Sequence, residues 1–485
     1  MKTNDTNSRK VVTRFAPSPT GFMHIGGVRT AIFAWLWARK NDGIFILRIE
    51  DTDKEREVEG SISHIMESLK WVGIDWDYGP DKPGTFGSCI QSERLETYRE
   101  FVDILIQKEL AYPDPYTIEE VELFRKKAEK DKLPFLFRNH RPENFQSWDC
   151  NKPLRFRVPE IKKYKWSDAV RGELSAGEEA LDDFILIKSD GFPTYNFAHI
   201  IDDYNMGVTH IFRSDEFISS TPKFLSLYNA LGISPPIFVT LPPILKDDRT
   251  KKLGKRDGAK DILEYRNEGY LPEAMFNFLS LIGWNPGGEK EVFSISEIIH
   301  NFSLERIHKS GGAFNEEKLD WMNKEHIKLL SDEDKFSYVK EYLNKKKSNE
   351  DIIKKVTPFI IDRIQKWSDI EKIEMEGELN FFFERPEFNM NLIYWKGVPQ
   401  PEKVKKYLNW IVNTLKSLGS EISSPDVAKN LIFNYASEKG RGEVLWPLRV
   451  SLSGREKSPD PFALLYILGK DESIRRIQVV IDMIK

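Results

Sequence analysis

The apolar residues at the start of the chain fall into short β-branched runs separated by a helical stretch. Residues 11–15 and 44–50 are apolar runs bounded by turn-forming residues, which predicts two buried strands. Residues 28–40 lie between them, favour a helix and end at Asn41-Asp42-Gly43, a typical helix stop. A strand, a glycine-containing turn, a helix and a second strand form a βαβ unit, so the pattern predicts a parallel sheet of the nucleotide-binding kind.

The middle of the chain mixes helical periodicity with short strands. The apolar spacing predicts a helix over 93–110, and Thr117-Ile118-Glu119-Glu120 forms a capping box that opens another. Short apolar runs predict strands over 156–158 and 184–188, followed by two strands over 208–213 and 237–241 that return to the first sheet. The interruption before that return predicts an inserted domain. From about Ser331 onward the periodicity predicts helices.

Composition narrows the class of protein. A chain of 485 residues is too long for one core and predicts roughly two to four domains. A net charge of −4 excludes a histone-like polycation but not a nucleic-acid enzyme, because phosphate binding needs a basic face and not a basic average. Two cysteines argue for a reducing compartment. The polar start and the short longest apolar run, 31–38, predict neither a signal peptide nor a membrane span, so we expect a soluble cytoplasmic protein.

The turn after the first predicted strand carries the stretch Pro17-Ser-Pro-Thr-Gly-Phe-Met-His-Ile-Gly-Gly27. Gly26 and Gly27 leave room for a phosphate at a helix N-terminus, whose amides and dipole favour an anion. His24 can donate a hydrogen bond to that phosphate. A histidine near a glycine is a weak signal by itself, and a solvated loop histidine is the alternative. Its place inside a βαβ unit favours a nucleotide site.

A second cluster, Lys251-Lys-Leu-Gly-Lys-Arg256, combines cations with a glycine. Such a loop can close over a triphosphate and compensate the negative charge that develops on it. A basic surface turn is the alternative, and it would be the better interpretation if the cluster stood alone.

Together the two motifs resemble the HIGH and KMSKS signatures of class I aminoacyl-tRNA synthetases, and they occur in the same order. Further stretches narrow the resemblance. They are Arg14-Phe-Ala-Pro-Ser-Pro-Thr-Gly21, Arg48-Ile-Glu-Asp-Thr-Asp53, Pro193-Thr-Tyr-Asn-Phe-Ala198, Ile201-Asp-Asp203, Gly269-Tyr-Leu-Pro-Glu-Ala274, Lys318-Leu-Asp-Trp-Met-Asn323 and Leu445-Trp-Pro-Leu-Arg449. These stretches are similar to the glutamyl-tRNA synthetases of that class, densely over residues 11–330 and more thinly toward the C-terminal end.

The resemblance implies an ATP-dependent ligase that attaches L-glutamate to tRNA-Glu. Glutamate attacks the α-phosphate of ATP to give glutamyl-adenylate and pyrophosphate, and the terminal adenosine hydroxyl of the tRNA then takes the glutamyl group. Positioning and charge stabilisation drive such steps, so a protein nucleophile is not expected. ATP is expected to bind as its Mg²⁺ complex, and the resemblance leaves open whether tRNA-Gln is also charged.

The resemblance also assigns site residues. The ATP site is assigned to His24, Gly26, Gly27, Glu216, Lys252 and Lys255, with His24, Lys252 and Lys255 as the catalytic group. The glutamate pocket is assigned to Arg14, Ala16, Ser18, Glu50, Tyr195 and Arg213. Arg14 is expected to bind the side-chain carboxylate, Arg213 the α-carboxylate and Glu50 the ammonium group. Ordinary ion pairs at strand ends are the alternative interpretation of Arg14, Arg48 and Glu50.

The sequence departs from the family pattern in three places. Gly254 stands where serine is usual, which removes a hydroxyl and adds flexibility. Phe217 stands where many members have histidine, which leaves the ribose or base contact at this position open. The stretch Tyr112-Pro-Asp-Pro-Tyr-Thr117 lacks the Cys-x-Cys of members that hold zinc, so no structural zinc and no other metal site is expected. Asp51-Thr52-Asp53 is similar to a glycosyltransferase metal motif, but its place after the second strand favours a turn and helix cap.

The expected architecture has four parts. A Rossmann-type α/β catalytic domain is expected over 10–115 and 201–245, interrupted by an α+β acceptor-end-binding domain over 116–200. A connecting domain over 246–330 and an all-α anticodon-binding region over 331–485 follow, in a protein expected to be monomeric.

Three other kinds of protein are alternatives to this interpretation. Glutaminyl-tRNA synthetases carry Pro-Glu-Pro-Asn in the first motif and a β-barrel C-terminal half, and a shorter glutamyl enzyme that modifies a tRNA base lacks the C-terminal half. A synthetase-like RNA-binding protein without catalysis is the alternative from another class, against which the presence of His24 and Lys255 argues.

Overall fold

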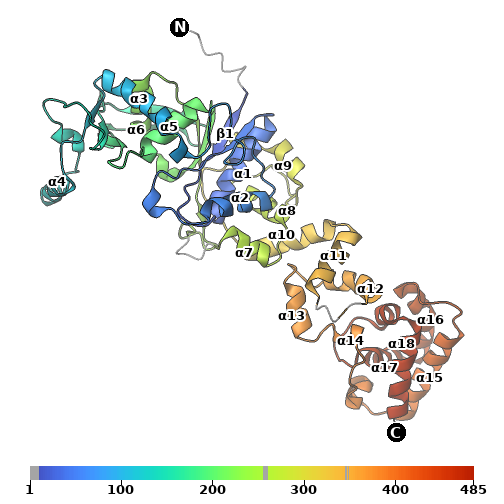
Figure 1. The fold of residues 1–485 in the computed structure, drawn as a ribbon. Helices are drawn as coiled ribbons and strands as arrows, with labels where there is room; N and C mark the ends of the chain where they lie inside the picture. Colours follow the sequence, from blue (N-terminus) through green and yellow to red (C-terminus); the bar gives the residue numbers. More distant parts are fainter. Residues whose placement is uncertain (1–9, 255–259, 344–346, 348, 485) are drawn as a thin grey trace. The chain divides into compact units, whose positions relative to one another are not determined.

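The protein consists of two compact units that meet in sequence between Met322 and Asn323, and we describe each by itself. The structure is a computed structural model that describes residues 10–254, 260–343, 347 and 349–484 (Figure 1). A mainly parallel sheet organises the first unit, whereas the regular elements described in the second are helices. The expected fold class, an α/β domain followed by a helical region, is therefore confirmed.

A six-stranded sheet in the order β2-β1-β8-β9-β5-β6 forms the centre of the first unit. The strands β2 (Ile44–Leu47), β1 (Val12–Phe15), β8 (His210–Ser214) and β9 (Ile237–Leu241) are parallel neighbours. Helix α1 (Ile25–Lys40) connects β1 to β2 and covers one face, where Thr13 Oγ1 donates to the Ala34 carbonyl at 2.8 Å. The predicted βαβ unit and the return of the two later strands to the sheet are thus both confirmed.

Three helices form a second layer with its own apolar core. They are α3 (Leu95–Gln107), α5 (Tyr195–Asn205) and α6 (Thr221–Leu231), which lie together beside the sheet in Figure 1. Their buried side chains include Tyr98, Phe197 and Leu227, which belong to one cluster. The apolar side chains of this layer hold α5 in place, and α5 carries acidic residues toward the sheet.

The segment expected to form an inserted domain over 116–200 is divided between two sheets. Strands β3 (Ala111–Pro113), β4 (Leu154–Phe156) and β7 (Phe184–Ile187) form a small antiparallel sheet, and α4 (Ile118–Lys130) begins at the predicted capping box. The hairpin of β5 (Tyr164–Asp168) and β6 (Gly172–Ala176) instead extends the main sheet next to β9. Asp168 explains this placement, because it accepts hydrogen bonds from the Thr240 amide and hydroxyl on β9.

The end of the first unit shares its core with α1. It contains β10 (Ile244–Leu245), α7 (Ile262–Asn267), α8 (Pro272–Leu281), α9 (Ile295–Asn301), β11 (Gly312–Ala313) and α10 (Glu316–Leu329), which crosses into the second unit. Met275, Leu279 and Trp284 pack in the same cluster as the buried face of α1. The expected connecting domain over 246–330 therefore does not have a core separate from that of the sheet.

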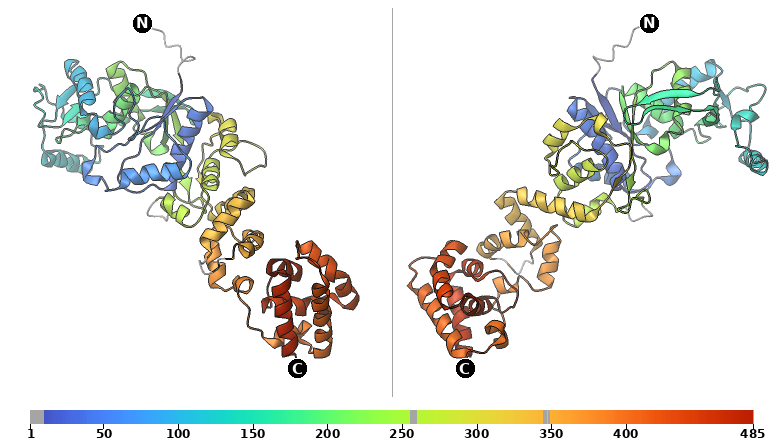
Figure 2. Two further views of the ribbon diagram at one scale, coloured as in Figure 1. Left: turned by 45° about the vertical axis from the view of Figure 1, so that its right-hand side comes forward. Right: turned by 180° about the vertical axis from the view of Figure 1, so that it is seen from behind.

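The second unit is a bundle of helices (Figure 2). Its α-helices after α10 are α11 (Asp332–Tyr342), α12 (Glu350–Ile361), α13 (Asp369–Met375), α14 (Asn380–Phe383), α15 (Pro401–Ser417), α16 (Pro425–Lys439), α17 (Arg441–Ser453) and α18 (Pro461–Met483). Arg476 on α18 is buried and donates to the Phe381, Leu452 and Glu384 carbonyls, so one guanidinium satisfies the ends of neighbouring segments. None of the helices described in either unit has the length and apolar run that crossing a membrane requires.

Candidate active site

The carboxyl ends of β1 and β8 lie side by side where the direction of the connections reverses. The chain passes from β1 through α1 to β2 on one side, and from β8 through α6 to β9 on the other. In open α/β sheets, ligands bind in the crevice at such a switch point. The residues at and just after these strand ends are therefore the first candidates for a site.

Three buried arginines from neighbouring strands share one face of the sheet near this point. Side chains alternate along a strand, so the residue after Thr13, which points to α1, points to the opposite face. The parallel registers of β1 with β2 and β8 bring Arg14, Arg48 and Arg213 to that same face. This face is the one that α5 covers.

Asp203 on α5 binds two of the three arginines. Arg14 donates to it from Nε and Nη2 at 3.2 and 3.3 Å, and Arg48 donates from Nη1 at 2.7 Å. Burial by itself raises the pKa of the Asp203 carboxyl, but the charges of Arg14 and Arg48 outweigh it and lower the pKa to about 2. Asp203 is therefore an anion at neutral pH and holds both guanidinium groups in place.

Glu50 is the second buried carboxylate of this cluster. It accepts a hydrogen bond from Arg48 Nη2 at 3.0 Å. Burial raises the pKa of the Glu50 carboxyl, although Arg48 and Arg14 oppose that shift. The surrounding cations therefore compensate its negative charge incompletely, and a substrate ammonium group would stabilise the ionised form further.

Arg213 differs from the other two arginines because it forms no ion pair within the described part of the chain. Its Nη2 donates to Thr221 Oγ1 at 2.6 Å, and its Nε is buried without a hydrogen-bond partner there. Its guanidinium lies over the Phe238 ring at 4.4 Å from the centroid. Burial lowers its pKa to about 10, so the group remains charged at neutral pH and its charge lacks a counter-anion.

Aromatic rings line the space between α5 and α6. Tyr195, the first residue of α5, stacks on His199 at 4.5 Å between centroids and contacts Phe217 at 5.4 Å. Phe217 therefore supports Tyr195. Burial lowers the pKa of His199 to about 3, so its ring is neutral. Its Nδ1 donates to the Tyr195 carbonyl at 2.6 Å, which leaves Nε2 as an acceptor.

Tyr228 on α6 is a buried residue of this region that the sequence analysis did not single out. Its hydroxyl has no hydrogen-bond partner among the described residues. Burial raises the pKa of this phenol, and the charges of Asp203, Arg14 and Arg213 also act on it. An unpaired buried hydroxyl is unfavourable unless a ligand satisfies it.

His24 caps the N-terminus of α1. Its Nδ1 accepts a hydrogen bond from the Gly26 amide at 3.0 Å, so a neutral ring carries its proton on Nε2, where it can be donated. A side chain at position 26 would lie 2.7 Å from the His24 ring, and one at position 27 would lie 3.3 Å from Met23. Packing against His24 and Met23 therefore also favours glycine at both positions, in addition to the expected room for a phosphate.

Two of the residues assigned to the ATP site, Glu216 and Lys252, are in contact. Lys252 follows β10 and forms an isolated antiparallel bridge to Leu245, and its Nζ lies 3.4 Å from Oε2 of Glu216, which follows β8. Ser214 Oγ donates to the other oxygen of Glu216 at 2.7 Å, and the resulting stabilisation lowers the pKa of that carboxyl, with Lys252 contributing. Lys255 lies outside the described residues.

Ala16 and Ser18 belong to the loop that continues β1. The amides of Arg48 and Glu50 donate to the Phe15 and Pro17 carbonyls at 2.9 and 3.0 Å, so this loop runs beside the segment after β2. Ser18 is exposed, whereas Ala16 is half-buried. The structure therefore brings together the buried Arg14, Glu50 and Arg213 with the half-buried Tyr195, and Ala16 and Ser18 lie on the adjoining loop.

The residues that sequence reasoning missed are Asp203, His199 and Tyr228. A signal for Asp203 was available, because two adjacent acids in an apolar helical segment, Ile201-Asp-Asp203, need buried cationic partners. His199 lies one helical turn after Tyr195, so its position beside that ring could also have been predicted. No local pattern marks Tyr228.

Metal ligands do not gather in the part of the chain that the structure describes. No group of three or more His, Cys, Asp and Glu side chains there could hold an ion. In the stretch 112–117, Asp114 forms an ion pair with Arg155 at 2.6 Å, and the Tyr112 hydroxyl donates to Asp183 at 2.7 Å. These side chains are therefore engaged in contacts within the protein.

Comparison with known proteins finds a matching family for each of the two units. The catalytic-domain family of class I tRNA synthetases (E and Q) matches residues 10–321, and an anticodon-binding domain family matches residues 334–481. Curated relatives include a glutamate–tRNA ligase of Clostridium botulinum, 38% identical over 99% of both chains, and one of Clostridium acetobutylicum, also 38% identical over 99% of both.

Solved structures agree with these relatives. A glutamate tRNA ligase of Elizabethkingia meningosepticum, crystallised in complex with its amino acid, has a TM-score of 0.85 and 35% identity. The match covers 98% of this chain and all of the other. A glutamate-tRNA synthetase of Elizabethkingia anophelis has a TM-score of 0.82 and 34% identity over the same shares.

Proposed function

The chain belongs to the glutamate–tRNA ligases, which are class I tRNA synthetases, and on that premise we propose which of its residues carry out each part of the reaction. It attaches L-glutamate to tRNA at the expense of ATP, through a glutamyl-adenylate. In the first step an α-carboxylate oxygen of glutamate bonds to the α-phosphorus of ATP and pyrophosphate leaves. In the second, the terminal adenosine hydroxyl of tRNA attacks the activated carbonyl carbon and AMP leaves.

Arg213 carries the proposal for the glutamate pocket, because its buried charge has no carboxylate partner among the described residues. The charge of Arg14 is already shared with Asp203. We therefore reverse the sequence-based assignment and propose that Arg213 binds the side-chain carboxylate, while Arg14 lies toward the α-carboxylate. Glu50 receives the ammonium group, the Tyr195 ring lines the pocket, and the loop with Ala16 and Ser18 covers it.

The proposed ATP site surrounds the N-terminus of α1. His24 is proposed to donate from Nε2 to a phosphate at the N-terminus of α1, and the positive end of the helix dipole adds to the attraction. Glu216 and Lys252, already in contact, and Lys255 complete the site from the other side. Mg²⁺ is proposed to enter on the ATP phosphate oxygens, ligands that this ion prefers, and to neutralise part of their charge.

We propose that three parts of the chain contact different regions of the tRNA. The acceptor end is assigned to residues 116–200, further stem contacts to 246–330, and the anticodon to the helical region over 331–485, which the anticodon-binding family supports. A monomer in the cytoplasm, without bound zinc, completes the proposal.

Aminoacylation with purified components tests the function. We expect transfer of glutamate, and not glutamine, to tRNA-Glu, with ATP consumed and AMP released. Including tRNA-Gln decides whether a second tRNA is accepted. Failure to charge tRNA-Glu under conditions in which the protein is folded would overturn the proposal.

A further inference from the structure

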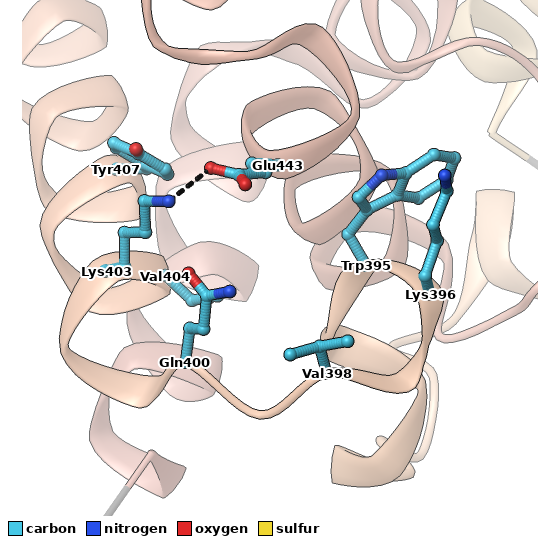
Figure 3. A pocket seen from close by; sticks show the side chains of 8 residues that line it. All are labelled: Trp395, Lys396, Val398, Gln400, Lys403, Val404, Tyr407 and Glu443. Carbon is cyan, nitrogen blue, oxygen red and sulfur yellow. Dashed lines mark ion pairs between the residues drawn. The ribbon is translucent and has the colours of Figure 1, made fainter.

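The helical unit contains a pocket of about 270 Å³ that the reaction does not use. It lies between the first turns of α15, the start of α17 and a tight 3₁₀ turn over Trp395–Gly397 (Figure 3). Its lining includes Trp395, Lys396, Val398, Gln400, Lys403 and Glu443. Pockets for drug-sized ligands typically span about 300–1,000 Å³, so this one suits a single small ring system.

Trp395 is a preformed flat surface on one side of the pocket. The residue is 37% exposed, yet its neighbours define the position of its ring. A side chain on Gly442 would lie 2.4 Å from the indole, so the ring rests on the bare backbone of α17. The Trp446 ring lies 5.2 Å away, and its own Nε1 is anchored by donating to the Leu392 carbonyl at 2.7 Å.

The turn that presents this tryptophan has an unfavourable backbone. Lys396 has a φ of 55° and Gly397 a φ of 71°, so two successive residues adopt the left-handed region, of which the first is not glycine. Such conformations persist where the surroundings impose them, and they concentrate at binding sites. The Lys396 Nζ lies 5.8 Å from the Trp395 ring centroid, which puts a cation beside the flat surface.

The opposite wall is polar and carries both donors and acceptors. Lys403 Nζ lies 2.6 Å from Glu443 Oε2, and the Gln400 amide lies below this pair in Figure 3. A nucleobase presents neighbouring donors and acceptors along its edge and a flat π-face above and below. A wall of this kind facing an aromatic ring therefore matches a base in both respects.

We propose that this pocket binds one unstacked base of the tRNA anticodon loop, with its ring on Trp395 and its edge toward Gln400, Lys403 and Glu443. The inference rests on the proposed function and on the match of residues 334–481 to an anticodon-binding domain. Sequence-specific RNA recognition generally targets single-stranded bases that stack on aromatic side chains. Lys396 then lies where the neighbouring phosphate can pass.

The first experiment measures binding of an RNA hairpin with the anticodon stem and loop of tRNA-Glu to the full-length protein. Base–aromatic stacking predicts that Trp395→Ala weakens binding roughly 5- to 150-fold, whereas Trp395→Phe keeps most of the affinity. Trp410→Ala is the matched control: Trp410 stacks on Tyr435 and does not line the pocket, so this variant is expected to leave hairpin affinity unchanged.

The second experiment combines the variant with hairpins that lack one loop base at a time. If the pocket holds one base, omission of that base and Trp395→Ala are strongly non-additive at a single loop position and additive at the others. Wild-type affinity of the Trp395→Ala protein, or additivity at every position, would overturn the proposal and leave a protein segment as the better occupant.

Two further measurements keep the result interpretable. If Trp395→Ala unfolds the helical unit, Glu443→Gln tests the same pocket. This variant is expected to change which base is tolerated at that loop position, and an unchanged base preference would contradict the proposal. Charging of tRNA-Glu by the wild-type protein is measured in parallel. If the wild-type protein charges tRNA-Glu but the effects of Trp395→Ala and base omission are additive at every loop position, only the proposed base pocket is rejected. If the wild-type protein does not charge tRNA-Glu, the proposed function itself is rejected.

Discussion

Arg14 and Arg213 stand on neighbouring parallel strands and face the same side of the sheet, but of the two only Arg14 has a carboxylate partner in the described part of the chain. Arg14 binds Asp203, whereas Arg213 donates to the Thr221 hydroxyl and lies against Phe238. The same side-chain type therefore has two tasks: one charge is balanced within the protein, and the other is left for a substrate anion.

This difference predicts distinct effects of two substitutions on amino-acid selection. A buried charge that loses its partner is unfavourable by ~3–5 kcal/mol, so Arg213 facing the neutral amide of glutamine gives roughly two to four decades of discrimination. Arg213→Gln is expected to lower the glutamate-to-glutamine ratio of kcat/KM by roughly two to four decades. Arg14→Gln is expected to lower kcat/KM for both amino acids alike.

Stability measurements on the same pair provide the control. Arg14→Gln weakens the pairing of the buried Asp203 and should lower the thermal midpoint, whereas Arg213→Gln removes an uncompensated charge and should leave it equal or higher. An unchanged glutamate-to-glutamine ratio of kcat/KM in Arg213→Gln would contradict the assignment of Arg213 to the side-chain carboxylate.

Tyr228→Phe tests whether the unpaired hydroxyl awaits the substrate. Because this hydroxyl has no partner among the described residues, its removal should not reduce the thermal midpoint. If it donates to bound glutamate, the KM for glutamate should rise about tenfold, the scale of one hydrogen bond to a charged group. A lower midpoint with an unchanged KM would instead assign the hydroxyl a structural role.

The pKa of His199 predicts how stability depends on pH. Its ordinary value of 6.5 falls to about 3 in the folded protein. Between these values the unfolded chain binds a proton that the folded chain refuses, so this group destabilises the fold by about 1.4 kcal/mol for each pH unit below 6.5. His199→Gln removes the effect.

The thermal midpoint of His199→Gln relative to wild type should therefore rise as the pH falls from 7 to 5. His300→Gln is the control, because His300 is exposed on α9. A difference between His199→Gln and wild type that stays constant over this pH range would contradict the assigned neutral state.

The lysine assignment is tested by aminoacylation rates. Lys255→Ala is expected to lower the rate by roughly two to three decades, the scale of one lost transition-state charge contact, with little change in thermal midpoint. Lys252→Ala should have a smaller effect, since its charge is shared with Glu216. Near wild-type turnover of Lys255→Ala would remove that loop from the catalytic site.

Metal analysis tests the expected absence of zinc. Chelator-treated protein should contain no stoichiometric zinc and keep its thermal midpoint, while the reaction should still require Mg²⁺ for ATP. A zinc ion that survives the chelator would contradict this expectation and would call for ligands other than cysteine.

The sequence by itself determined the local elements and the chemistry of the motifs. The capping box at Thr117 forms both of its expected hydrogen bonds, because its partners lie three residues apart. The β-branched run before Pro17 forms β1, and the His24 segment begins α1, since strand and helix signals act over a few residues. The two motifs and the further similar stretches along the chain were sufficient to assign the family.

Only the tertiary structure decided which charges are paired. Arg14 meets Asp203 across 189 residues, and Arg48 meets it across 155. Strand alternation predicts that the arginines share a face, but not which helix covers that face or which arginine its carboxylate reaches. The hairpin of β5 and β6 joins the main sheet, and Tyr228 comes near the arginines, for the same reason: packing between distant segments depends on the shape of the whole core, which no local pattern of residues contains.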